Sequence, residues 1–187
     1  MTFYYTARGV FDKDYTEDGM SWHKYIEWSR LTQLRELVSV DAMLNDVLVE
    51  VDHNDANDWN YIVTDDGYET GFFTTLEYVL QKTKSRESFN LLTVVIEPAN
   101  DCNDILLEGF EFMGYDLLDK DYSISALSNC GGFDETFLPS ELNEVGLIGD
   151  RSKAFTIKKL LLENNPWEHH ADTNVIAIWR HKTIGKK

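Results

Sequence analysis

Cys130 lies in the part of the chain whose residue types best suit enzyme chemistry. It follows Asn129 and precedes two glycines, a setting in which an exposed thiolate could attack a carbonyl carbon while backbone amides stabilise the oxyanion. His169 or His170 could serve as the general base. Two acids follow Cys130 closely and disfavour a thiolate. A cysteine-dependent hydrolase or transferase is therefore an alternative, beside the simpler interpretation that Cys130 is a small apolar residue before a turn.

Two groups of potential metal ligands fail the spacing that known metal sites require. His169 and His170 are adjacent, so on an extended segment their side chains point to opposite faces. In the acid-rich loop that begins at Asp52, positions six and twelve are Asn57 and Val63, where a calcium loop of the EF-hand type needs Gly and Glu. The sequence therefore predicts neither a metal site nor a cofactor.

Aromatic residues alternate with acids between residues 52 and 69, a stretch that contains no Lys or Arg. Tyr and Trp are common anchors of protein interfaces, and surrounding charges steer the encounter. We predict a partner-binding surface here, formed by Asp52, Asp55, Asp58, Trp59, Tyr61, Asp65, Asp66, Tyr68 and Glu69. The alternative is that Trp59 and Tyr61 face the core and the acids only keep the protein in solution.

Negative charge is concentrated in the middle of the chain. From Glu36 to Asp150 there are 25 acids and four bases, a net charge of −21, whereas the flanks hold 8 acids and 13 bases and bring the total to −16. Such a surplus costs folding free energy through self-repulsion and projects a negative potential into solvent. A basic partner would offset that cost, whereas nucleic acid and anionic membranes, being polyanions, are not expected to bind directly.

These observations favour an acidic binding protein that neutralises a basic partner. An immunity protein or inhibitor of a nuclease-type toxin, or a nucleic-acid mimic, would fit, because nucleases hold phosphates in cationic clefts. A second alternative is a homo-oligomeric structural subunit, in which an exposed strand at residues 3–11 pairs with that of another copy. With no secretory signal and two cysteines in 187 residues, a cytoplasmic location is expected.

The order of patterns along the chain predicts a single α+β domain over residues 1–187, with a mostly antiparallel sheet covered by three to four helices. Neither a strict βαβ alternation nor a steady series of short strands is present. The predicted strands are 3–11 (an edge strand), 47–51, 59–64, 90–97, 105–119, 122–127 and 175–180. The predicted helices are 21–38, 75–84, a short one from 139, and 150–162.

Two of these elements carry strong local signals. Thr74 and Glu77 match a capping box, and Phe73 and Tyr78 stand where a hydrophobic staple would close, so a helix should begin at residue 75. Residues 91–96 form a continuous apolar run before Pro98, which is typical of a central strand buried on both faces.

Overall fold

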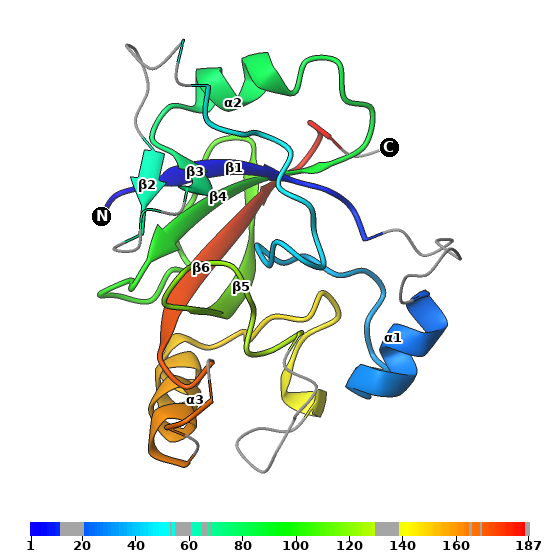
Figure 1. Ribbon diagram of the computed structural model, residues 1–187, viewed down its shortest axis with the longest axis vertical. Coiled ribbons are helices and arrows are strands. Elements are labelled where there is room, and N and C mark those ends of the chain that lie inside the picture. Colours follow the sequence, from blue (N-terminus) through cyan, green and yellow to red (C-terminus); the bar gives the residue numbers. More distant parts are fainter. Residues whose placement is uncertain are drawn as a thin grey trace.

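Antiparallel strands form a sheet in the order β2-β3-β1-β4-β6-β5 in this computed structural model (Figure 1). The structure describes residues 1–11, 21–52, 54, 61–64, 67, 69–129, 139–164, 166–168 and 170–185. Within them the elements are β1 (Tyr4–Arg8), α1 (Trp22–Ser29), β2 (Tyr61–Val63), β3 (Glu69–Phe73), α2 (Leu76–Lys82), β4 (Asn90–Ile96), β5 (Phe110–Asp119), the short 3-10 helix η1 (Pro139–Glu141), α3 (Arg151–Asn164) and β6 (Thr173–His181). The predicted α+β class and antiparallel sheet are confirmed.

The buried strands agree with their sequence patterns, whereas the predicted edge strand does not. β4 pairs with β1 on one side and β6 on the other, as its apolar run predicts. The prediction that residues 3–11 form an edge strand is wrong, because β1 lies between β3 and β4 with both edges paired. β1 therefore has no free edge to pair with another copy of the chain, while a homo-oligomer formed in another way stays a prediction.

Two further predicted strands, 47–51 and 122–127, are irregular segments with isolated bridges. Val47 pairs only with Arg8, and Ser125 only with Leu118. The Asp119 carboxylate accepts hydrogen bonds from the backbone N–H groups of Ser123 and Ile124. This side chain closes a turn directly after β5, so the chain departs from the sheet before a full ladder forms.

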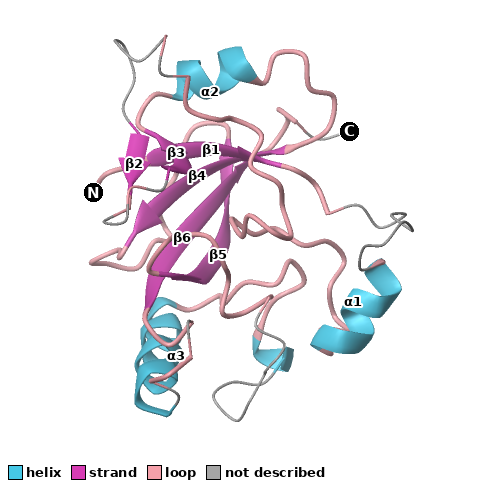
Figure 2. Ribbon diagram, viewed as in Figure 1, coloured by secondary structure: helices cyan, strands magenta, loops and turns pink. Residues whose placement is uncertain are grey.

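The first helix is shorter than its apolar periodicity predicts. Ser21 caps it as expected, since its Oγ accepts from the Lys24 N–H, but the helix ends at Ser29. Arg30 adopts the left-handed conformation with φ 60°, and the Ser29 hydroxyl accepts from the N–H of Leu31. These local bonds redirect the chain, and residues 31–52 run as a long irregular segment (Figure 2). Many of its residues are buried.

The other helices begin close to the predicted residues. The N-cap of α2 is Thr75, not Thr74, and its side chain makes no capping bond, although the predicted contact of Phe73 with Tyr78 is present with ring centroids 4.9 Å apart. Asp150 caps α3 through a 2.7 Å bond from the Lys153 N–H to its carboxylate. The third predicted helix, at residue 139, is only the 3-10 turn η1.

Apolar residues fill both faces of the sheet, and the α-helices of the described residues cover one of them. The larger cluster takes side chains from all three α-helices, including Tyr25, Val79 and Ile157. The smaller cluster lies on the opposite face, where irregular segments around Val38 and Leu147 cover it. The alternation of residues along β6 follows this division, because Val175 belongs to the first cluster and Ile176 to the second.

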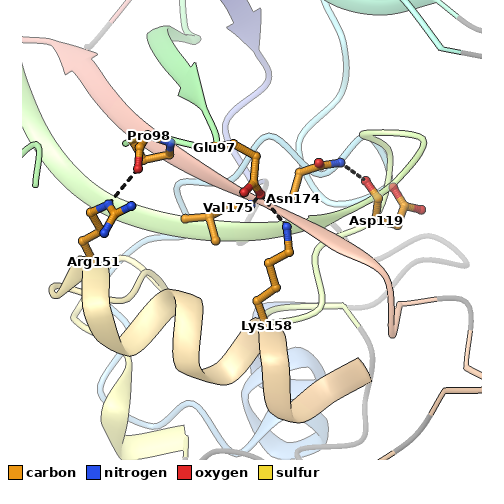
Figure 3. Close-up of polar contacts among 7 residues, drawn as sticks. All are labelled: Glu97, Pro98, Asp119, Arg151, Lys158, Asn174 and Val175. Atoms are coloured by element: carbon orange, nitrogen blue, oxygen red, sulfur yellow. Dashed lines mark hydrogen bonds and ion pairs between the residues drawn. The ribbon is translucent and has the colours of Figure 1, made fainter. Parts of the chain in front are cut away.

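Glu97 ties α3 to the end of β4 (Figure 3). One of its carboxylate oxygens lies 2.7 Å from both the Lys158 Nζ and the backbone N of Val175. Arg151, in the first turn of α3, donates from Nε to the carbonyl of Pro98 at 2.7 Å. Glu97 takes a positive φ of 47°, an uncommon conformation for a residue other than glycine, and it turns the chain out of β4 toward the long connection to β5.

Candidate functional site

Three of the nine predicted partner-binding residues lie in the described part of the chain. Asp52 accepts from the Asn54 N–H and from Lys82 Nζ at 3.2 Å, and these bonds lower the pKa of its carboxyl group. Tyr61 begins β2 and Glu69 begins β3. The other six predicted residues, Asp55, Asp58, Trp59, Asp65, Asp66 and Tyr68, lie outside the described residues.

The predicted cysteine site is only partly described. Cys130 and His169 lie outside the described residues, and His170 is buried. The other cysteine, Cys102, is buried as well, and its burial raises the pKa of the thiol, which makes it a poor nucleophile at neutral pH. Among the described residues, no group of His, Cys, Asp and Glu side chains is placed to hold a metal ion.

The fold brings some acids of the negative middle segment next to bases of the positive flanks. Four acids of the negative middle segment pair with bases from the flanks. These ion pairs are Glu36 with Arg180 at 2.8 Å, Glu97 with Lys158 at 2.7 Å, Glu141 with Lys153 at 2.9 Å and Glu144 with Arg35 at 3.1 Å. An acid's place in the sequence is therefore a poor guide to the potential around it.

Three other acids of the middle segment are buried and hold the structure together. The Asp41 carboxylate accepts from the backbone N–H groups of Met43, Leu44 and Ser125, and from the Asn129 amide. The Asp116 carboxylate accepts from the hydroxyls of Ser39 and Ser125, and Asp119 forms the turn after β5. Burial raises the pKa of Asp116 to about 6, against the bonds from the two serines. These three side chains are therefore not part of the exposed surface.

A group of exposed acids lies beside an exposed leucine on the segment between β4 and β5. We call residues 100–109 the acidic connection, because Asp101, Asp104 and Glu108 are exposed there. Leu106, between the latter two, has 95% of its surface exposed. Acids and an aliphatic residue are thus exposed side by side. The connection lies within a stretch of 33 residues, Glu87 to Asp119, that holds eight acids and no base.

Buried contacts fix the acidic connection in place. β6 separates β4 from β5 in the sheet, so this segment has to cross β6. Trp179 of β6 donates from its indole N–H to the carbonyl of Ile105 at 3.3 Å. The Tyr115 hydroxyl donates to the Asp101 carboxylate at 2.9 Å and accepts from the Cys102 N–H at 2.8 Å.

The exposed Leu106 is therefore held by its neighbours instead of by contacts of its own. Ile105 and Leu107, on either side, pack against the larger core, and the N–H of Phe110 bonds to the carbonyl of Leu107. At the two ends of the connection, the Arg151 charge helps to lower the pKa of Asp101, and the backbone N–H of Lys182 bonds to the carbonyl of Gly109. A preordered apolar side chain between carboxylates is suited to contact a surface that is basic around an apolar recess.

No protein-family model, curated protein or solved structure matches this chain.

The acidic connection does not follow from the search for acids interleaved with Trp and Tyr, because it contains neither residue. The signal that points to it is the absence of any base from residue 87 to residue 119. The predicted strand from residue 105 includes its aliphatic residues, whereas β5 begins at Phe110.

Within the part of the chain that the structure describes, no helix is both long and apolar enough to cross a membrane.

Proposed function

We propose that this protein is an acidic binding protein that neutralises a basic protein partner through the acidic connection. The observation that carries the proposal is Leu106, whose side chain is 95% exposed on a segment that buried hydrogen bonds hold in place. Leaving a leucine in water forgoes about 1.5–3 kcal/mol of burial free energy. A partner that covers Leu106 would recover part of it at little cost in ordering the segment.

The negative charge around Leu106 favours a cationic protein as the partner. Asp104 and Glu108 flank Leu106 and the whole chain carries a net charge of −16, so the approach of a cationic protein is accelerated and that of an anionic one is opposed. A nuclease-type toxin is the simplest case, because its substrate cleft has to be cationic to hold phosphates. In that case the protein acts as an immunity protein or inhibitor and mimics the charge of nucleic acid.

The cysteine-dependent enzyme remains the alternative from another functional class. No contact in the described residues favours it, because its nucleophile and one of its two bases lie outside them. Thiol titration separates the two proposals: reactivity of Cys130 well below the ordinary cysteine pKa of about 8.5 would favour the enzyme.

Leu106→Ser is expected to abolish capture of the basic partner, whereas Leu162→Ser is expected to leave it unchanged. Leu162 is the matched control, because it is also a substantially exposed leucine and lies on α3. Each variant and the unchanged protein would be used as bait in extract of the native host at low and high salt, with the captured proteins identified by mass spectrometry. A basic protein that elutes with salt and is lost only with Leu106→Ser supports the proposal. Equal capture by the two variants, or capture of acidic proteins alone, contradicts it.

A further inference from the structure

A cavity of about 430 Å³ lies beside β1 and β3, away from the acidic connection. Its volume is within the range of about 300–1,000 Å³ that small-molecule sites occupy. Its lining combines one cation, two acids, hydroxyl groups and apolar side chains. The lining residues are Arg8, Ala42, Val47, Glu69, Thr70, Asp121, Tyr122 and Ser123.

Arg8 is a lining residue with a buried hydrogen-bond donor that has no acceptor. Its side chain is completely buried, with Nε bonded to the Thr6 hydroxyl at 3.2 Å and Nη2 to the carbonyl of Thr70 at 3.0 Å. The guanidinium lies 5.5 Å from the ring centroid of Phe72. Nη1 has no hydrogen-bond partner in the described structure, and a buried donor left unpaired costs about 1–3 kcal/mol.

The guanidinium is charged at neutral pH in spite of its burial. Burial lowers the pKa of Arg8 to about 10, while the nearby Asp41 carboxylate opposes this effect. Arg8 therefore places a full positive charge beside the cavity, and its buried Nη1 group has no hydrogen-bond acceptor. An anionic oxygen acceptor is the chemical group that satisfies both needs.

The walls of the cavity are built in conformations that depend on particular residues. Gly71 has a φ of +70°, and a Cβ there would lie 2.7 Å from Cγ1 of Val47, so only glycine lets β3 pass this close. Tyr122 also has a positive φ, of 57°, and its ring packs edge-on against Phe72 at 6.1 Å. The hydrogen bonds of Asp119 hold this turn. A positive φ is unfavourable for a residue such as Tyr122, though not for glycine, and such conformations are found more often at ligand sites.

The surrounding charges restrict the anion that fits. Asp41 lies close enough to Arg8 to affect its pKa, and Glu69 and Asp121 line the cavity itself. Three carboxylates near one guanidinium repel a dianion such as phosphate. The same two lining carboxylates would favour an ammonium group beside the bound anion, and Ala42 and Val47 supply apolar wall.

We propose that this cavity binds a small zwitterion of the amino-acid class. Its carboxylate faces the Arg8 guanidinium, its ammonium group faces Asp121 and Glu69, and its side chain packs between Ala42, Val47 and Tyr122. The site does not depend on the acidic connection or on the proposed protein partner.

The proposal is tested by the thermal stability of the full chain in the presence of free L-amino acids with small, apolar, aromatic and polar side chains. At least one is expected to raise the melting temperature at millimolar concentration, and calorimetry would then give its affinity. The amine-free acid and the carboxylate-free amine of the same side chain, and inorganic phosphate, should each bind about tenfold more weakly or worse. Failure of every amino acid to bind overturns the proposal, as does equal binding of any of these three controls.

Variants locate the site. Ala42→Leu fills part of the cavity and leaves Arg8 unsubstituted, so it is expected to abolish binding. Ala99→Leu, at an exposed alanine elsewhere, should leave binding unchanged. Arg8→Lys keeps the charge but loses the guanidinium fork, and should weaken binding by about tenfold or more. If Arg8→Lys does not fold, Ala42→Leu still tests the proposed site. An affinity of this variant equal to that of the unchanged protein would overturn the proposal.

Discussion

The double variant Asp104→Lys, Glu108→Lys is expected to associate with the basic partner about tenfold more slowly, or slower still, at low ionic strength. Both side chains are exposed on the acidic connection, and their reversal changes the local charge by +4 around Leu106. Electrostatic steering acts on the approach of the two proteins, so the association rate should fall more than the dissociation rate rises. Stopped-flow or surface-plasmon measurements at several salt concentrations would give both rates.

The matched control is Glu27→Lys, Glu87→Lys. These acids are also exposed, on α1 and after α2, and their reversal gives the same net charge for the whole protein. This control should retain an association rate within a few-fold of the unchanged protein. Because salt screens charges beyond about 10 Å at 0.1 M, the difference between the two variants should shrink as salt rises. If both variants slow association equally, net charge matters but the acidic connection does not.

Asp116→Asn is expected to change how stability depends on pH. Burial raises the pKa of Asp116 to about 6 in the folded protein, above the ordinary carboxyl value of about 3.9 in the unfolded chain. The folded state thus binds the proton more tightly, and its contribution to stability is complete below about pH 4 and is lost as the pH rises through 6. Relative to the unchanged protein, Asp116→Asn should gain on the order of 3 kcal/mol between pH 4 and 7.

The substitution itself should be tolerated, because Asp116 bonds to the hydroxyls of Ser39 and Ser125. A hydroxyl can rotate to accept from the asparagine amide instead of donating. Urea unfolding of both proteins at a series of pH values would give the difference in free energy of unfolding. A difference that stays constant from pH 4 to 7 would show that Asp116 does not titrate in this range.

Asp101→Asn provides the control for this measurement. Bonds from the Asn103 N–H and the Tyr115 hydroxyl lower the pKa of Asp101, so its ionised form stabilises the fold. That contribution is present above the ordinary carboxyl pKa and is lost only as the pH falls below it. The difference between Asp101→Asn and the unchanged protein should therefore be flat from about pH 5 to 7, where that of Asp116→Asn rises.

Burial patterns and caps made the central part of the fold predictable. A strand that is apolar on both faces, such as β4, is expected in the middle of a sheet, where both faces are buried. A cap such as Asp150 acts on the adjacent N–H groups, so sequence neighbours suffice to locate it. β1 was misplaced at an edge because the identity of its neighbours, β3 and β4, depends on contacts distant in sequence.

Side-chain hydrogen bonds explain the elements that the sequence did not predict correctly. Apolar residues recur beyond Ser29 at helical spacing, but the left-handed Arg30 ends α1 there. Residues 122–127 alternate like a strand, but the Asp119 carboxylate accepts from the N–H groups of Ser123 and Ile124. Both outcomes depend on a few polar contacts worth about 1 kcal/mol each, which a pattern of apolar residues does not reveal.

The net charge of the chain predicts an acidic surface for a basic partner without any knowledge of the fold. That partner stays a prediction, and the sequence does not locate the surface. The fold decides which acids are available: it buries Asp41 and Asp116 and pairs Glu36 with Arg180. It also leaves Leu106 exposed between Asp104 and Glu108.

Hydrogen–deuterium exchange of the protein with and without its captured basic partner tests the proposed function most directly. Protection on binding should be strongest at residues 100–109, and weak or absent on α1 and at residues 52–69. Protection confined to residues 52–69, or to any surface that excludes Leu106, would contradict the assignment of the site to the acidic connection.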